Sequence, residues 1–281
     1  MYDFYKKIIQ DFLERNYTKG RKYNGVQQNI EYIVLHYTAG LSSKKGQARE
    51  NRNYFNIYKE DPNKRSSAHY IVDDVEIIQA VRDEDTSWHC GGTPNKYQPN
   101  GSKFYNKCRN TNSIGIEMCS YNTSGKPYNK CYATDKYWFF TDKVINNTIE
   151  LVYYLMKKYD IPMERVILHY DVTGKWCPAP WLNEPDKYVD FKNKLKKYIE
   201  DKEDENMTNE TFKKLFDEMR KELQDNDSGA WSKEARDWAT KEGLINGNGT
   251  EINGEPNCMW QDFLTREQLA AVLYKFYKMI K

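Results

Sequence analysis

Short runs of apolar, mostly β-branched residues recur through the first 200 residues of this 281-residue chain. Each run is too short for a helix and suits a buried strand of a sheet. Asp73 and Asp74 stand between two of the runs and predict a turn there. The predicted strands are 32–35, 70–72, 75–78, 114–118 and 166–168.

Two amphipathic stretches accompany these strands. The spacing of apolar residues predicts a helix over 142–159, with Thr141 as its N-cap and Pro162 just beyond its end. A second helix is predicted over 186–199. Together these elements predict a mixed α/β domain with one central β-sheet flanked by helices.

The distribution of charge indicates where this domain ends. Residues 1–200 hold 31 Lys/Arg and 24 Asp/Glu, a balance of +7, whereas residues 201–207 carry −3 and residues 208–281 carry −2. The almost wholly charged segment 201–207 is typical of a solvated linker, and the frayed end of the preceding helix is the alternative. We therefore expect domains at 1–200 and 208–281.

The segment after this boundary has only helical patterns. An apolar stripe predicts one helix through Phe212 and Leu223, and Ser232 is expected to cap a short helix that stops at Gly243. Thr265 and Gln268 form a capping box that opens a third helix. This predicts a small all-α domain, near the lower size limit for independent folding.

The N-terminal residues 1–16 scatter charges through their apolar positions. A secretory signal peptide needs an unbroken apolar core, so classical secretion is not expected. The mean hydropathy is −0.94, and no apolar run approaches the ~20 residues of a membrane helix. We therefore expect no insertion into a membrane.

The chain has only four histidines, and two of them end predicted strands. His36 follows 32–35 and His169 follows 166–168, so both imidazoles can meet at one edge of the sheet. Cys177 comes eight residues after His169, and Gly174 lets the chain turn back between them. Two imidazoles and a thiolate suit Zn²⁺, and three protein ligands leave a fourth position for water, as in catalytic sites.

Each of these residues also has a simpler interpretation. A histidine at a strand end can belong to the core or the surface, a buried cysteine can be inert packing, and Lys175 can be an ordinary surface lysine. Two neighbours favour the metal site. Glu117 lies at the end of an apolar strand, and burying its carboxylate there costs free energy unless the group faces a polar site. Lys175, two residues before Cys177, could stabilise an oxyanion.

Five motifs occur in a fixed order, and together they resemble a known family. They are IVLHYTAG, SSAHYIVDD, SWHCGG, NSIGIEM and HYDVTGKWCP. The set resembles the zinc-dependent N-acetylmuramoyl-L-alanine amidases of the type 2 amidase and peptidoglycan-recognition-protein superfamily. The similarity spans about 1–200 and is greatest to phage endolysins and bacterial autolysins.

The resemblance implies a function for each position. By motif it implies His36, His169 and Cys177 as zinc ligands, Glu117 as the catalytic carboxylate and Lys175 as the oxyanion-stabilising residue. It also implies hydrolysis of the amide between N-acetylmuramic acid and L-alanine of bacterial peptidoglycan.

One departure from the family concerns the second motif. Some members carry an active-site tyrosine immediately before the histidine of this motif, where this chain has Ala68. Glu117 is then expected to act as general base alone. Tyr37, Tyr70, His69 and His89 are candidate substrate-binding residues; for the two histidines, a role beside the site and a purely structural role are both open.

The segment 230–277 resembles a single S-layer-homology-like repeat, a cell-wall-anchoring unit. The resemblance implies binding to the wall, including an anionic wall polymer. Its tryptophans can equally form the small core of the module, so no binding residue is assigned.

Three functions from different classes are compatible with the sequence. The first is a wall-degrading amidase, and the second is a non-catalytic peptidoglycan receptor on the same fold, which Cys177 and Lys175 disfavour. The third is a zinc protein that binds nucleic acid, for which no finger spacing or recognition helix is present. For an amidase without a signal peptide, the resemblance implies synthesis in the bacterial cytoplasm and release at lysis, as in a phage; a host autolysin and a prophage remnant are the alternatives. The sequence does not specify an oligomeric state.

Overall fold

The computed structural model describes residues 4, 7–40, 46–94, 101–127 and 130–281; the side chains of 63 and 205–208 are not described. The chain divides into two compact units, Met1–Glu200 and Asp201–Lys281. The first unit contains all five motifs, and the second contains the segment that resembles a wall-anchoring repeat.

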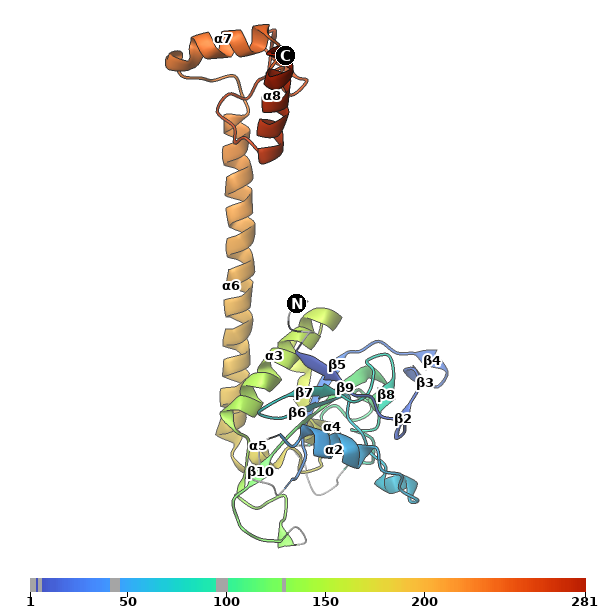
Figure 1. The fold of residues 1–281 in the computed structure, drawn as a ribbon. Coiled ribbons are helices and arrows are strands. Elements are labelled where there is room, and N and C mark those ends of the chain that lie inside the picture. The colour runs from blue at the N-terminus through green and yellow to red at the C-terminus, as the bar shows by residue number, and fades with distance from the viewer. Residues whose placement is uncertain (1–3, 5–6, 41–45, 95–100, 128–129) are drawn as a thin grey trace. The chain divides into compact units, whose positions relative to one another are not determined.

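A six-stranded mixed sheet forms the centre of the first unit (Figure 1). Its order is β1 (Ile8–Gln10), β7 (Ile77–Gln79), β6 (Tyr70–Val72), β9 (Ser113–Met118), β5 (Tyr32–Tyr37) and β12 (Val166–Leu168). Only β6 and β7 pair antiparallel; the other neighbours in this sheet are parallel. The predicted mixed α/β fold with a central sheet is confirmed. The strand β1 was not predicted.

The turn between β6 and β7 lies slightly later than expected. The Asp73 carboxylate accepts hydrogen bonds from the backbone N–H groups of Val75 and Glu76, at 2.7 and 2.8 Å. These bonds close a turn over the first half of the predicted strand 75–78. The strand itself therefore begins at Ile77.

Alternation along β5 separates two hydrophobic clusters. Ile33 and Leu35 pack in the larger cluster with α3 (Asp142–Tyr159), while Tyr32 and Val34 pack on the opposite face with Ile167. Because successive side chains of a strand point to opposite faces, His36 shares the face of Val34. Thr141 caps α3 as predicted, its side chain accepting from the Val144 N–H.

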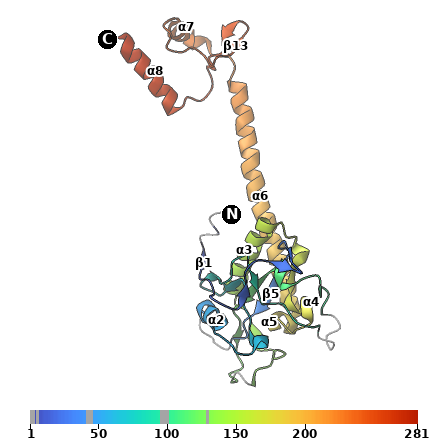
Figure 2. The same ribbon diagram turned by 90° about the vertical axis from the view of Figure 1, so that its right-hand side faces the viewer.

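Further helices cover the sheet and support the site (Figures 1 and 2). Phe55 of α2 (Ala48–Phe55) packs with Ile71 and Ile78. The short helices α4 (His169–Thr173) and α5 (Ala179–Asn183) follow β12. Three short strand pairs complete this unit: β2 (Tyr17–Thr18) with β8 (Thr86–Ser87), β3 (Lys22–Tyr23) with β4 (Val26–Gln27), and β10 (Tyr121–Asn122) with β11 (Trp138–Phe139).

Residues 201–207 continue the preceding helix, which was the alternative to a solvated linker. These residues belong to one continuous helix, α6 (Pro185–Leu223), which also contains the predicted helix 186–199. Lysine and glutamate are good helix formers, and ion pairs four residues apart, such as Lys196 with Glu200, support helical turns without an apolar face.

The second unit contains a hairpin as well as helices, so the all-α prediction is wrong in this detail. β13 (Glu251–Ile252) and β14 (Glu255–Pro256) pair antiparallel across Asn253-Gly254, both of which have positive φ. Asn-Gly is the preferred pair for such a turn. Besides the C-terminal part of α6, this unit contains the helices α7 (Lys233–Lys241) and α8 (Arg266–Met279).

The caps of the two C-terminal helices differ. The capping box of Thr265 and Gln268 is present at the start of α8. Ser232 occupies the N-cap of α7 without a capping bond, since its hydroxyl donates to the Gly229 carbonyl.

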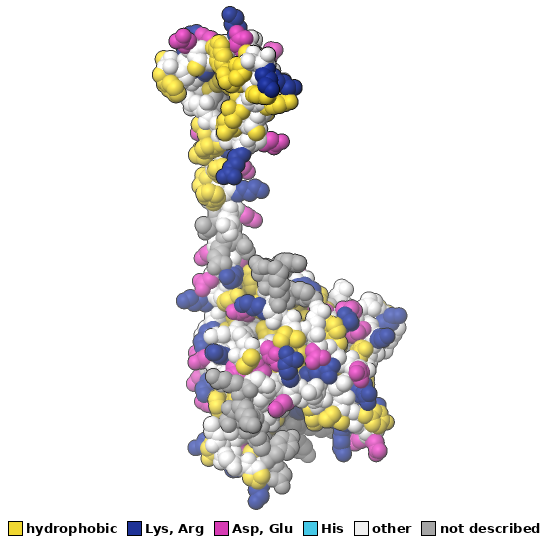
Figure 3. Space-filling view, viewed as in Figure 1, with side chains coloured by type: hydrophobic (Ala, Val, Ile, Leu, Met, Phe, Trp, Pro, Cys, Tyr) yellow, Lys and Arg dark blue, Asp and Glu magenta, His cyan; other side chains and the backbone are white. Residues whose placement is uncertain are grey.

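Large apolar side chains gather on the surface of this unit (Figure 3). Trp231 is 91% exposed, and Phe263, Leu273 and Ile280 are exposed as well. Among the described helices of the chain, none has the length and apolarity required to cross a membrane.

Candidate metal centre

Three adjacent parallel strands deliver polar side chains to one edge of the main sheet. His36 lies near the end of β5, and its register partner on β9 is Glu117. On the other side of β5, Leu168 of β12 pairs with Leu35, so His169 follows directly beside His36. Parallel strands present their carboxyl ends at the same edge, and this topology explains why residues distant in sequence meet here.

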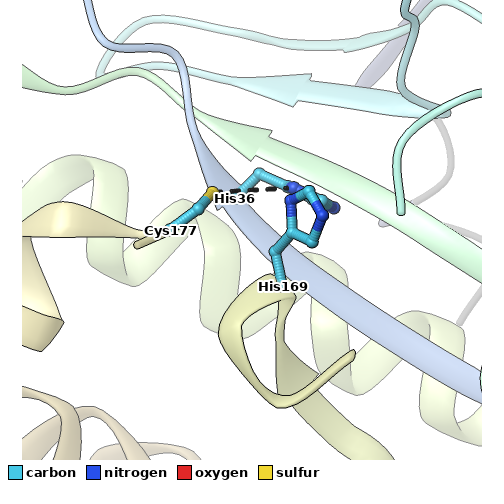
Figure 4. Close-up of side chains that lie close together, drawn as sticks. All are labelled: His36, His169 and Cys177. Carbon is cyan, nitrogen blue, oxygen red and sulfur yellow. Dashed lines mark hydrogen bonds between the residues drawn. The ribbon is translucent and has the colours of Figure 1, made fainter. Parts of the chain in front are cut away.

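The chain then turns back to add a thiol. The helix α4 ends at Gly174, whose φ of 74° lies in the left-handed region that glycine adopts without strain. The Tyr170 N–H donates to the Cys177 carbonyl at 2.9 Å and fixes the returning segment. Figure 4 shows the side chains of His36, His169 and Cys177 converging on one point.

These three side chains form a group that fits a metal ion. One ligand atom from each lies within 4.8 Å of the others, and all three residues are buried. The Cys177 Sγ is 3.7 Å from His36 Nδ1. Two ligands of a tetrahedral zinc ion, one nitrogen and one sulfur, are about 3.6 Å apart.

Unpartnered polar atoms provide a second test of this fit. Neither ring nitrogen of His169 has a hydrogen-bond partner among the described residues, and the same holds for Glu117 Oε2. Burying such atoms without a partner costs free energy. A cation at this point would bind one ring nitrogen of His169, so the residues present fit Zn²⁺.

Burial sets the protonation of the three ligands. It lowers the pKa of His36 and His169 well below the ordinary value, with smaller contributions from neighbouring histidines and Lys175. Both rings are therefore neutral at pH 7, as ligands must be. Burial, followed by the charge of Glu117, raises the pKa of the Cys177 thiol to about 12. Metal binding must displace this thiol proton.

Glu117 and Lys175 adjoin this group. Burial raises the pKa of Glu117 to about 8, and the positive charge of Lys175 opposes the shift. Lys175 is exposed and lines a cavity of about 530 Å³ together with His169, His89 and Trp88. A substrate in this cavity would contact the metal group and the ammonium together.

Two residues expected to bind substrate do not reach the cavity. Tyr70 is 1% exposed, and its hydroxyl donates to the Asp83 carboxylate at 2.7 Å. His69 is fully buried, with its ring nitrogens held by Ser87, Gly115, Arg21 and Asp85. Both are corrected to structural roles, because their side chains lie inside the core.

The other two candidates lie beside the metal group. The ring of Tyr37 packs against Trp138, and its backbone N–H bonds to the Cys177 thiol. His89 lines the cavity, and its Nδ1 lies 3.0 Å from His36 Nε2. Ser113, which forms a hydrogen bond with His89, was not predicted as a site residue. Gly115 in the same strand was the available sign, because a glycine inside a strand can mark the close approach of another group, here the His89 ring.

The similarity of this chain to known proteins is not confined to the motifs around these residues. Residues 26–180, more than half of the chain, match the family described as N-acetylmuramoyl-L-alanine amidase. The amidase CwlL of Bacillus licheniformis is 31% identical over 192 residues, which cover 67% of this chain and 46% of CwlL. BlyA of Bacillus subtilis (strain 168) is 30% identical over 179 residues, covering 60% of this chain and 42% of BlyA. The chain thus spans about half the length of these curated relatives.

Solved structures also match about two thirds of the chain. The structure of PlyL is 27% identical and covers 67% of this chain and 96% of that chain, with a TM-score of 0.46. The catalytic domain of XlyA is likewise 27% identical, covering 67% of this chain and 98% of that chain, with a TM-score of 0.44. On the family match over 26–180, the chain belongs to the N-acetylmuramoyl-L-alanine amidase family.

Proposed function

We propose that this protein is a zinc-dependent peptidoglycan amidase that hydrolyses the amide between N-acetylmuramic acid and L-alanine. The observation that carries the proposal is the convergence of His36, His169 and Cys177 beside Glu117. Family membership supports the substrate, because the relatives CwlL and BlyA are N-acetylmuramoyl-L-alanine amidases.

The three ligands would hold Zn²⁺ through a ring nitrogen of each histidine and the Cys177 sulfur. Bound there, zinc supplies Lewis acidity toward a carbonyl oxygen and lowers the pKa of water. The substrate would enter the cavity beside His169, and Lys175, which lines that cavity, would bind the oxygen that gains negative charge.

Glu117 is assigned the proton transfers. Its carboxylate takes a proton from the attacking water and returns it to the nitrogen of the leaving alanine. A carboxyl group whose pKa is raised toward neutrality suits both directions of transfer. Position 68 holds alanine where some family members have a tyrosine, so Glu117 would carry out the proton transfers alone.

The second unit is assigned to the cell wall. Its exposed tryptophan and other apolar side chains offer a surface for a wall polymer, separate from the residues assigned to catalysis. We place the site of action at the wall after release from the cytoplasm at lysis, on the family resemblance to phage endolysins. The net charge of +7 on residues 1–200 would attract this unit to anionic wall polymers.

Dye-labelled peptidoglycan tests this function. The zinc-loaded protein should release dye and generate new amino groups, and a chelator should abolish both until zinc is restored. Binding to peptidoglycan without release of dye or amino groups would instead identify a receptor and refute the proposal.

A further inference from the structure

We propose that His89 is a positioning residue for the metal group. Together with Ser113 it forms a one-way chain of hydrogen bonds that fixes the tautomer of His36 and turns the Nδ1 lone pair toward Cys177. The inference rests on the proposed zinc site but concerns how tightly the metal is held, whatever bond the enzyme cuts.

The chain begins at a group that can only accept. The Arg109 carbonyl oxygen lies 2.6 Å from Ser113 Oγ, so the hydroxyl hydrogen of Ser113 points to it. A serine hydroxyl has a single hydrogen. Toward any other neighbour, Ser113 Oγ must therefore accept.

The next link is His89. Its Nε2 lies 3.0 Å from Ser113 Oγ and must carry the hydrogen of that bond. A neutral imidazole has one N–H, so His89 Nδ1 is then an acceptor. The atom 3.0 Å from it, His36 Nε2, has to be the donor.

The last link reaches the metal group. With its hydrogen on Nε2, the neutral ring of His36 has a lone pair on Nδ1, the nitrogen 3.7 Å from Cys177 Sγ. The Arg109 carbonyl, four residues before β9 begins, thereby selects the tautomer that a metal requires. Metal-binding histidines generally owe their orientation to a hydrogen bond of this kind from the other nitrogen.

The sheet leaves a space for the His89 ring. A Cβ at Gly115 would lie 2.5 Å from His89 Cγ, so only glycine permits the ring to rest on β9. The Asn110 side-chain oxygen accepts from the backbone N–H groups of His89 and Cys90, at 3.1 and 2.8 Å. The ring is therefore held from its backbone, its face and both nitrogens.

Side-chain ¹⁵N NMR on the wild-type protein tests the tautomer without any substitution. We expect His36 to carry its hydrogen on Nε2 in the metal-free protein and to keep it there when zinc is added. A hydrogen on His36 Nδ1 in the metal-free protein, or zinc bound through Nε2, would overturn the proposal.

Zinc affinity, measured by competition with a chelator, tests the energetic role. His89→Leu removes the acceptor and should weaken zinc binding by roughly 10–100-fold. His89→Asn places an oxygen on Cγ where Nδ1 stood and should bind zinc within about threefold of wild type. Ser87→Ala is a control that should leave zinc affinity unaltered, because Ser87 contacts the buried ring of His69 and not that of His89.

The outcomes separate this inference from the proposed function. A folded His89→Leu variant that binds zinc as tightly as wild type, or an Asn variant as weak as Leu, would refute the role of His89. A wild-type protein that binds zinc as expected but releases no amino groups from peptidoglycan would refute only the amidase assignment. Near-ultraviolet circular dichroism establishes that each variant is folded.

Discussion

The two units of the molecule differ in which groups lie in an unfavourable environment. At the sheet edge of Met1–Glu200, polar atoms of His169 and Glu117 are buried without a hydrogen-bond partner among the described residues. In Asp201–Lys281, large apolar side chains such as Trp231 are exposed to solvent. Under the proposed function, a cation would satisfy buried polar atoms of the first unit, and the exposed apolar side chains of the second would form a contact surface.

The proposed function gives the two units separate tasks. Changes at the sheet edge should alter turnover and metal binding, and changes in the second unit should alter retention on the wall. A substitution in one unit that impaired the task of the other would break this separation.

The largest effect is expected from Glu117→Gln. Loss of the group that moves the proton should lower turnover by roughly 10²–10⁴-fold. Zinc should remain bound, since the three ligands are intact, and this is checked by metal analysis of the purified variant. Cleavage of purified walls at close to the wild-type rate would show that Glu117 is not the general base.

Zinc should stabilise the first unit alone. At a free concentration a hundredfold above its Kd, zinc should raise the free energy of unfolding of that unit by about 2.7 kcal/mol. Calorimetry with and without zinc measures this change. Cys177→Ser should diminish the gain, and Cys258→Ser, which alters a free thiol of the second unit, should preserve it. An equal loss in both variants would contradict the assignment of the ligand.

The pH dependence of the metal-free protein offers a third test. The pKa of Glu117 is raised from 4.5 to about 8, so between these values the unfolded chain has lost a proton that the folded chain keeps. Stability due to this group therefore falls as pH rises from 4.5 to 8.

Glu117→Gln removes that dependence. The stability of the variant relative to wild type should increase between pH 5 and pH 8, by on the order of 1–3 kcal/mol, and then level off. Urea unfolding at each pH measures the difference. The buried histidines, whose pKa values are lowered, act in the opposite direction below about pH 6.5 but are common to both proteins. Glu234→Gln, an exposed change in the second unit, is the control; a flat difference for Glu117→Gln would refute burial of its carboxyl.

The smallest effect on stability is expected in the second unit. Trp231→Ala removes an exposed ring and should change the free energy of unfolding by less than about 0.5 kcal/mol. It should nevertheless reduce the fraction of protein that sediments with purified walls, measured in a Glu117→Gln background. Tyr132→Ala, which removes an exposed aromatic ring from the first unit, should leave sedimentation unaltered. Equal retention of both variants would remove Trp231 from the binding surface.

The sequence predicted those features that depend on alternation and motif order. The strands ending at His36 and His169 were predicted because β-branched runs are buried and a polar residue at their end stands out. The turn that brings Cys177 back toward His169 was predicted from another local signal, the glycine at position 174. The convergence of these three residues follows from the parallel pairing of β5 with β12, which strand order along the chain does not specify.

Other features depended on tertiary contacts or on weak local preferences. Tyr70 and His69 lie in a family motif, yet their partners Asp83 and Gly115 hold them inside the core. The helix through 201–207 was only the alternative prediction, because its residues favour a helix without giving it an apolar stripe. The Asn253-Gly254 turn was a local sign of a hairpin, which the helical neighbours obscured.

Mass analysis of digested peptidoglycan tests the central claim most directly. Zinc-loaded wild-type protein should yield N-acetylmuramic acid with a free lactyl carboxyl and stem peptides that begin with a new N-terminal alanine. The glycan strands should remain uncut. Shortened glycan strands, with every muramoyl–alanine amide intact, would contradict the account.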